Sequence, residues 1–340
     1  MLRINYWKCF SPCLFLATAM AAAAAGTDNP FLGSWELTLP NGAAGWLGVQ
    51  NANGQLQASL LWAGGSVLPL ASAKVEDATL VVTRQRQVQW KDDAGVTVKT
   101  NITDTIIGRV DGDAMKLTII TPRENGAGEE KKEFTGQRTP AMPPAPDLKR
   151  VKFGKAIKLF NGKDLTGWRL TNPNAFNGWS VKDGLLLNTV VHEEGKPHNN
   201  YGNLRTDQEF EDFNLTLETR VPPNGNSGVY IRGIYEVQVF DSYGKPLDSH
   251  NMGAIYSRIK PTQNAEKPAG EWQSLDITFV DRHVTVVLNG IKIIDNQPVE
   301  GCTGGALWSD VIRPGPIYLQ GDHTSIEYRN IVIRPVIKKA

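Results

Sequence analysis

Alternating apolar and polar residues are the first pattern visible in the chain, between residues 31 and 138. The alternation is plain at residues 56–60 and 116–119. A period of two is typical of antiparallel strands with one buried face. We therefore expect a small β-barrel or sandwich, with strands at residues 34–39, 55–62, 79–84, 101–110 and 115–121 and hairpin turns at Asn41-Gly42, Asn53-Gly54 and Asp111-Gly112.

The second half of the chain repeats short apolar runs at the spacing of a β-sandwich, and it lacks long amphipathic helical patterns. Asn289-Gly290 predicts a type I′ turn between two of these runs, because Asn-Gly supplies both positive-φ positions. The chain is thus predicted to be all-β. We expect its later strands at residues 157–160, 179–181, 185–188, 213–221, 228–232, 235–241, 272–280, 284–288, 291–295 and 326–336.

Proline is concentrated between the two halves, at residues 139–146. Proline lacks a backbone donor and favours polyproline-like geometry, so this stretch is predicted to be extended and outside any sheet interior. We place an accessory N-terminal β domain at residues 26–138, a Pro-rich linker at 139–150 and the second β domain at 151–340.

The first 25 residues have the pattern of a secretory signal peptide. Arg3 and Lys8 precede an apolar stretch at residues 13–20 and a run of alanines, and cleavage is expected between Ala21 and Gly26. The apolar stretch is short for a membrane span, although an uncleaved anchor is the alternative. A periplasmic or secreted protein with no membrane span in the mature chain is predicted.

Composition excludes some partners and some chemistry. The 340 residues contain 41% hydrophobic residues, enough for real cores, and carry a formal net charge of +1, too little to hold a phosphate backbone. Nucleic acid is therefore not expected as a partner. Two of three cysteines, Cys9 and Cys13, lie in the signal segment, so the mature chain keeps Cys302 alone, which we interpret as a small core residue and not a nucleophile.

Polar residues interrupt an apolar, β-rich stretch at residues 226–241. Glu236 and Gln238 are two apart in a predicted strand, hence on one face and about 7 Å from each other. A solvent-facing strand is the alternative. Asp241 falls on the opposite face unless the strand bulges or ends, and it equally suits the start of a turn. Arg232 points away from Glu236 if the hairpin loop has two residues and lies opposite it if the loop has three.

Several motifs together resemble one family, the 3-keto-disaccharide hydrolase domain family, long catalogued as a domain of unknown function. The resemblance covers about residues 156–336. Its motifs are residues 159–168, Asp212-Phe213, Glu218-Thr219-Arg220, Asn226-Ser227-Gly228, residues 235–241, 253–256 and 270–272, Leu288-Asn289-Gly290, and residues 319–323 and 328–331.

The resemblance implies a concanavalin A-like jelly-roll β-sandwich whose concave face carries the site of an exported enzyme. Its expected activity is a glycosidic-bond hydrolase or lyase acting on 3-keto sugars, with a carbohydrate as substrate. A 3-ketone acidifies the C2 proton, so a tuned carboxylate or imidazole can remove it before elimination and hydration. Candidate catalytic residues are Glu236, His323 and Arg232, and candidate substrate-binding residues are Gln238, Asn226, Tyr256, Gln320 and Asp241.

Three alternatives remain open from the sequence. A divalent metal cation could be held by Glu236, Asp241 and His323 and act as a Lewis acid, although no His pair has the i, i+4 spacing of a helical metal site. A conventional retaining glycoside hydrolase would use Glu236 and Asp241 with carboxyl groups about 5 Å apart. A non-catalytic carbohydrate-binding module could use the same fold.

Overall fold

The computed structural model describes residues 29–91, 94–124, 126–191 and 199–337, and Phe31–Ala340 form one compact unit. The predicted signal peptide, residues 1–25, lies outside the described residues. Strands, turns and irregular segments account for every described residue, so the all-β prediction is confirmed. Across these ranges there is no helix long and apolar enough to cross a membrane.

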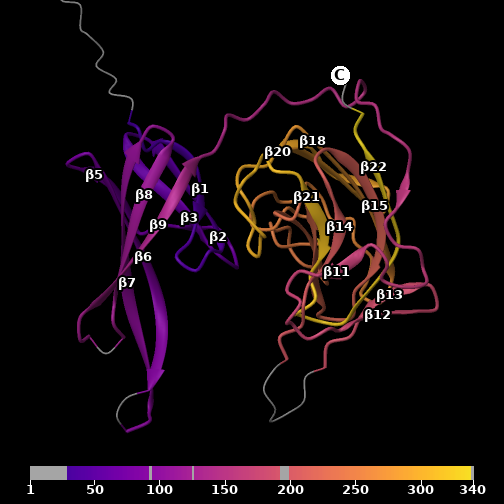
Figure 1. The fold of residues 1–340 in the computed structure, drawn as a ribbon, viewed down its shortest axis with the longest axis horizontal. Coiled ribbons are helices and arrows are strands. Elements are labelled where there is room, and N and C mark those ends of the chain that lie inside the picture. Colours follow the sequence, from indigo (N-terminus) through magenta and orange to yellow (C-terminus); the bar gives the residue numbers. More distant parts are fainter. Residues whose placement is uncertain (1–28, 92–93, 125, 192–198, 338–340) are drawn as a thin grey trace, which may run out of the picture. The chain divides into compact units, whose positions relative to one another are not determined.

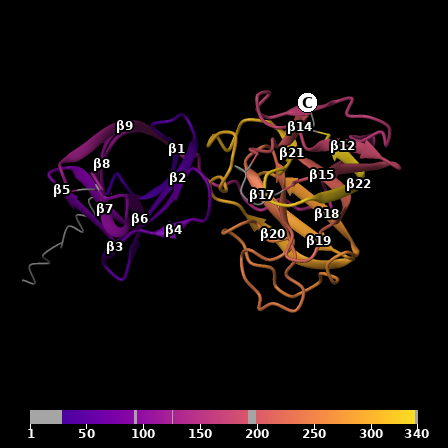
Figure 2. The ribbon, with the colours of Figure 1, turned by 90° about the horizontal axis from the view of Figure 1, so that it is seen from below.

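The N-terminal part is a closed antiparallel barrel (Figures 1 and 2). Neighbouring strands follow the order β4-β3-β2-β1-β9-β8-β7-β6-β5. Residues 68–72 close the ring, because Leu70 N–H donates to Ala58 on one side and Ala71 N–H donates to Thr83 on the other. The strands are β1 (Gly33–Thr38), β2 (Ala44–Ala52), β3 (Gln55–Trp62), β4 (Leu68–Pro69), β5 (Ser72–Glu76), β6 (Thr79–Lys91), β7 (Thr97–Asp111), β8 (Ala114–Pro122) and β9 (Glu129–Arg138).

The barrel core consists of the inward residues of each strand, among them Trp35, Leu47, Leu60 and Leu117. Closing a sheet on itself removes its exposed edges, which explains why this small domain is a barrel and not an open sheet. The sequence did not predict β9, because only two of its ten residues are buried and its first half is charged. It pairs with β1 through Trp35 and Arg138 and completes the ring.

The C-terminal part is a two-sheet sandwich of the jelly-roll type, which confirms the predicted fold class (Figure 1). An eight-stranded sheet has the order β12-β13-β22-β15-β18-β19-β20, with β10 paired to β22, and a five-stranded sheet has the order β11-β14-β21-β16-β17. The strands are β10 (Ile157–Lys158), β11 (Trp168–Leu170), β12 (Trp179–Lys182), β13 (Leu185–Asn188), β14 (Leu204–Phe210), β15 (Phe213–Arg220), β16 (Asn226–Ile231), β17 (Tyr235–Phe240), β18 (Trp272–Val280), β19 (His283–Leu288), β20 (Ile291–Pro298), β21 (Gly315–Leu319) and β22 (Ile326–Pro335).

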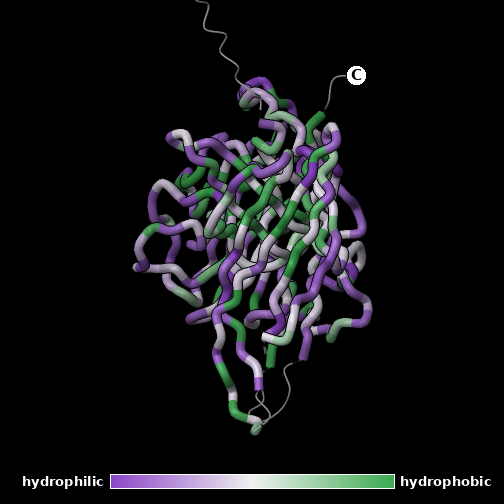
Figure 3. Tube along the Cα trace, turned by 90° about the vertical axis from the view of Figure 1, so that its left-hand side faces the viewer, coloured by the Kyte–Doolittle hydropathy of each residue, from purple (hydrophilic) through white to green (hydrophobic). Residues whose placement is uncertain are grey.

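The sandwich core lies between the inner faces of the two sheets. Val229, Val237 and Leu319 of the five-stranded sheet face Leu215 and Ile277 of the other sheet within one apolar cluster. Figure 3, in which the N-terminal barrel faces the viewer, shows hydrophobic segments within the strands and mostly hydrophilic ones in the turns that join them. Because side chains alternate along a strand, residues 228, 230, 236, 238 and 318 lie on the outer face of the five-stranded sheet.

The predicted Asn-Gly turns are present. Asn289 and Gly290 have φ of 51° and 82° and join β19 to β20, while Asn53 and Gly54, with φ of 54° and 78°, join β2 to β3. Residues 139–146 form no strand. They run along the sandwich, where Arg282 Nη1 donates to the carbonyl of Pro140 at 2.8 Å.

Candidate functional site

The β16–β17 hairpin carries the polar residues that the sequence singled out. Glu236 pairs with Tyr230 and Gln238 pairs with Gly228, so both side chains lie on the outer face of the five-stranded sheet, as the strand period predicts. They are not solvent-facing, because Glu236 is only 4% and Gln238 only 3% exposed. A carboxyl group is therefore buried on the outer face of the five-stranded sheet.

The Glu236 carboxyl group has three close neighbours. The Tyr230 hydroxyl lies 2.8 Å from Oε2. With its amide nitrogen turned toward Glu236, Gln238 donates to Oε1 at 3.2 Å and to the Ser227 carbonyl at 3.1 Å. A side chain at Gly228 would collide with Oε1, so the carboxyl group leans across this glycine. Burial raises the pKa of Glu236 to about 8, and the hydrogen bond from Tyr230 only partly offsets this.

A glycine turn covers this carboxyl group. The Tyr230 and Tyr318 rings stack with centroids 3.9 Å apart, and both hydroxyl groups lie 2.6 Å from carbonyl oxygens, that of Tyr230 from Gly304 and that of Tyr318 from Gly305. Thr303 Oγ1 also accepts the backbone N–H of Glu236 at 2.9 Å. Residues 303–305 thus close one side of the site.

Next to Glu236, the outer face of the five-stranded sheet is more exposed. Gln320 N–H donates to the carbonyl of Gly228, so Gln320 is a neighbour of Gly228. The Glu236 carboxyl group lies over the same glycine. Gln320 is half-buried, and its Oε1 is buried without a hydrogen-bond partner. Asn226, also half-buried, lies within 3.2 Å of the Gln238 amide. These amides form a polar strip beside Glu236.

Tyr256 borders the other edge of Glu236. Its N–H donates to the Glu236 carbonyl at 3.0 Å, and the adjacent bridge between Val237 and Ile255 places Tyr256 on the same face as Glu236. The Tyr256 ring packs edge-to-face on His250 at 4.7 Å. The structure therefore brings Glu236, Gln238, Asn226, Tyr256 and Gln320 onto one face.

Arg232 does not join this group. The hairpin loop is Arg232-Gly233-Ile234, between the paired residues Ile231 and Tyr235, so Arg232 lies in the turn itself with φ of 54°. Its guanidinium donates to the carbonyls of Ile312 and Arg313, the latter at 2.7 Å. The expectation that a three-residue loop sets Arg232 opposite Glu236 is wrong, because Tyr230 occupies that position.

Neither Asp241 nor His323, both within the described ranges, is hydrogen-bonded to Glu236. Asp241 follows β17, and its Oδ2 accepts the backbone N–H of Asn224 at 2.8 Å, in the turn that precedes β16. His323 is exposed in the loop after β21. Within the described ranges no group of three His, Cys, Asp or Glu side chains is arranged to hold a metal ion. The predicted ligand set Glu236, Asp241 and His323 is therefore not assembled.

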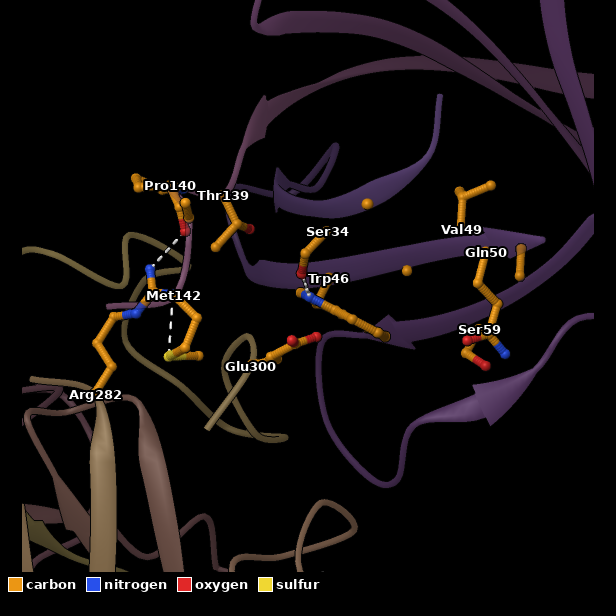
Figure 4. Close-up of a pocket in the computed structure, with 14 residues that line it drawn as sticks. Ser34, Trp46, Val49, Gln50, Ser59, Thr139, Pro140, Met142, Arg282 and Glu300 are labelled. Atoms are coloured by element: carbon orange, nitrogen blue, oxygen red, sulfur yellow. Dashed lines mark hydrogen bonds between the residues drawn. The ribbon is translucent and has the colours of Figure 1, made fainter. Parts of the chain in front are cut away.

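A separate cavity of about 410 Å³ lies against β2 and the proline-rich segment (Figure 4). Trp46, Met142 and Glu300 line it, and the Arg282 guanidinium at its edge contacts the Met142 sulfur at 3.4 Å. Glu236 is not among its lining residues. Cys302 is buried, which raises its thiol pKa to about 11, so it is the inert core residue that the sequence predicts.

Comparison with known proteins adds to this geometry. Residues 155–334, more than half of the 340-residue chain, match the 3-keto-alpha-glucoside-1,2-lyase-like domain family. The chain belongs to this family. The match confirms the family resemblance inferred from the motifs, and it contains the whole β16–β17 hairpin and the glycine turn at residues 303–305.

Individual relatives are more distant. The chain is 26% identical over 148 residues to the 3-keto-disaccharide hydrolase of Bacteroides thetaiotaomicron, a match that spans 36% of this chain and 51% of that protein. The chain thus spans about half the length of this curated family relative. A crystal structure of a candidate glycosyl hydrolase from Parabacteroides distasonis is 33% identical and covers 57% of this chain and 93% of that chain, with a TM-score of 0.43. Beta-agarase B of Zobellia galactanivorans is 12% identical, over 59% of this chain and 98% of that chain, with a TM-score of 0.37.

Sequence reasoning missed Tyr230 and Tyr318 in this family domain. Because side chains alternate along a strand, Tyr230 lies on the same face as Asn226 and Gly228, and the sequence could have predicted this orientation. Its contact with Glu236 depends on the register of the hairpin, which the sequence left open. Tyr318 reaches the site only because β21 pairs with β16 across the sheet.

Proposed function

We propose that the jelly-roll domain cleaves the glycosidic bond of 3-keto-glycosides, with Glu236 as the general base. The observation that carries the proposal is the buried Glu236 carboxyl group, whose pKa is raised to about 8 on the outer face of the five-stranded sheet. A base whose pKa lies near the working pH combines an ionised fraction with a strong affinity for the proton. Family membership supports the choice of substrate class.

The proposed reaction begins at C2 of the oxidised sugar. The 3-ketone acidifies the C2–H bond, Glu236 takes this proton, and the electron pair forms the C1–C2 double bond as the C1–O bond breaks. The aglycone oxygen leaves and gains a proton, and water then adds across C1 and C2. The net reaction is hydrolysis, with elimination as its first half.

The polar strip beside Glu236 is proposed to bind the sugar. Gln320 Oε1 lacks a hydrogen-bond partner although it is buried, so a sugar hydroxyl that donates to it would remove the cost of an unpaired acceptor. The amides of Gln238 and Asn226 provide further donors and acceptors. Tyr256 borders the same row and offers a ring face and a hydroxyl group.

A retaining mechanism with Glu236 and Asp241 is not favoured by the geometry. Five residues of strand separate their Cα atoms by about 16 Å, and retention needs carboxyl groups about 5 Å apart. Arg232 is not retained as an electrostatic stabiliser, since its guanidinium is bound to backbone carbonyls. A periplasmic or secreted location, from the N-terminal pattern, forms part of the same proposal.

The test is a turnover assay with a 3-keto-disaccharide and its unoxidised parent. We expect release of 3-keto-glucose from the oxidised sugar alone. Glu236→Gln keeps the shape of the side chain and should lower the rate by about 10²–10⁴-fold, the usual contribution of a general base, whereas Asp241→Asn should retain activity. Sugar binding without any turnover would indicate a carbohydrate-binding module, and cleavage of the unoxidised sugar would overturn the proposal.

A further inference from the structure

We propose that the β3–β4 loop of the N-terminal barrel, residues 63–67, is a positioning element of the jelly-roll site. It fixes the Gly304-Gly305 turn, whose carbonyl competes with Glu236 for the hydroxyl proton of Tyr230. This inference rests on the function proposed above for Glu236. It assigns a role to the barrel, which lies outside the matched family domain at residues 155–334.

The loop and the turn meet backbone to backbone. A Cβ atom added to Gly304 would collide with the backbone oxygen and nitrogen of Gly65, and Gly305 N–H donates to the Ala63 carbonyl at 3.2 Å. No side chain separates the two segments at this point, and backbone atoms cannot give way as a flexible side chain can. The barrel loop therefore limits how far the glycine turn can withdraw from the site.

Tyr230 transmits this contact to Glu236. Its hydroxyl oxygen lies 2.6 Å from the Gly304 carbonyl and 2.8 Å from Glu236 Oε2. A hydroxyl group has one proton, so it donates to only one of these two oxygens at a time. When Glu236 is protonated, it can donate to Tyr230 while Tyr230 donates to Gly304. When Glu236 is ionised, Tyr230 must turn its proton to the carboxylate and leave Gly304 without that donor.

The same loop also supports the other edge of the site. Ser66 Oγ lies 2.8 Å from His250 Nε2, and His250 packs against the Tyr256 ring. Val67 N–H donates to Ser257 Oγ at 2.9 Å, one residue beyond Tyr256. The loop thus contacts the segments on both sides of Glu236. A domain that was only tethered through a linker would not need these contacts.

The experiment follows the protonation of Glu236 in the full-length chain by infrared spectroscopy of its carboxyl group, assigned by its loss in Glu236→Gln. Gly304→Ala forces the turn and Gly65 apart. Because Gly65 lies behind the turn, the Gly304 carbonyl is pressed toward Tyr230 and competes more strongly with Glu236 for the hydroxyl proton. We expect the midpoint of the titration to rise by about half to one pH unit, the equivalent of one hydrogen bond. Tyr230→Phe removes the donor and should raise the midpoint by a similar amount.

Three further variants make the result specific. Gly64→Ala adds a methyl group in the same loop where no atom lies within 4 Å, and it should titrate as the wild type does. Gly304→Ala combined with Tyr230→Phe should titrate as Tyr230→Phe alone. Should Gly304→Ala not fold, Ser66→Ala releases the loop from His250 and lets the turn withdraw from Tyr230, so this variant is expected to lower the midpoint.

A wild-type midpoint in both Gly304→Ala and Ser66→Ala would overturn the inference. So would a Gly304→Ala shift that persists in the Tyr230→Phe background, since the effect would then bypass Tyr230. The infrared titration needs no turnover. If these shifts occur but no 3-keto-disaccharide is cleaved, the proposed function fails and the coupling between barrel and carboxyl group stands.

Discussion

At the scale of single residues, the unusual feature is a carboxyl group that the fold buries with neutral neighbours. Tyr230 and Gln238 are the hydrogen-bonding side chains at Glu236, and neutral donors compensate an ionised carboxylate less well than a cation does. Desolvation therefore dominates, and the pKa of Glu236 rises to about 8. Ionisation of this buried carboxyl group lowers the stability of the folded protein. Buried groups with shifted pKa values are found at functional sites, where the ionised form is used.

The stability of the protein should depend on pH through Glu236. Because its folded pKa of about 8 exceeds the ordinary value of 4.5, the native state binds the proton more tightly than the unfolded chain. The contribution of Glu236 to stability is fully present below about pH 4.5 and is lost as the pH rises to about 8. Over this window the melting temperature of Glu236→Gln should fall less than that of the wild type. The difference should be several degrees, since about 1 kcal/mol moves Tm by about 2–4 °C.

Glu36 provides the control for this measurement. Burial raises its pKa to about 7, so Glu36→Gln should also flatten the curve, but only up to about pH 7. Parallel wild-type and Glu236→Gln curves between pH 7 and 8 would contradict the assigned ionisation of Glu236.

At the scale of elements, the β16–β17 hairpin shows what local sequence can and cannot specify. Asn289-Gly290 and Asn53-Gly54 fix two-residue turns by their chemistry, and the structure has both. Arg232-Gly233-Ile234 has no such signature, so the register of Glu236 could not be read from it. The face shared by Glu236 and Gln238 could be predicted, because it depends only on the strand period. Their burial and the pairing with Tyr230 could not.

Arg232 should behave as a structural residue of this turn. Its guanidinium donates to the carbonyls of Ile312 and Arg313 and lies 5.6 Å from the Phe279 ring centre. Arg232→Ala leaves these carbonyls unpaired, and we expect a loss of about 2–4 kcal/mol in urea denaturation, since hydrogen bonds from a charged donor each contribute about 1.5–3 kcal/mol. The turnover rate of the folded fraction should change less than about threefold. A loss of turnover at unchanged stability would show that Arg232 acts on the substrate.

At the scale of the whole molecule, the site depends on segments that are far apart in sequence. The glycine turn at residues 303–305 covers a carboxyl group at residue 236, and barrel residues 63–67 contact that turn. Neither of these two contacts produces a periodic or compositional pattern in the sequence. The sequence therefore predicted the barrel only as an accessory domain. The structure places Phe31–Ala340 in one compact unit.

Trp46 should hold the barrel and the sandwich in one cooperative unit. Its ring lies 4.1 Å from the Arg258 guanidinium and fills the space where a Cβ atom of Gly301 would lie. Trp46→Ala is expected to cost about 3–5 kcal/mol and to split a single calorimetric transition in two. Trp62→Ala, which removes a ring packed on Phe134 within the barrel, should leave no such separation. A single transition at the wild-type temperature in Trp46→Ala would contradict this role.

The central claim, that Glu236 removes the C2 proton of a 3-keto-glycoside, is tested most directly with a substrate that carries deuterium at C2. We predict a primary isotope effect on cleavage, roughly severalfold at pH values where proton removal limits the rate, and a rate that rises with pH as Glu236 ionises around pH 8. We also expect that Glu236→Gln no longer catalyses this proton removal. Full cleavage activity in Glu236→Gln, with deuterium and hydrogen substrates reacting at equal rates, would contradict it.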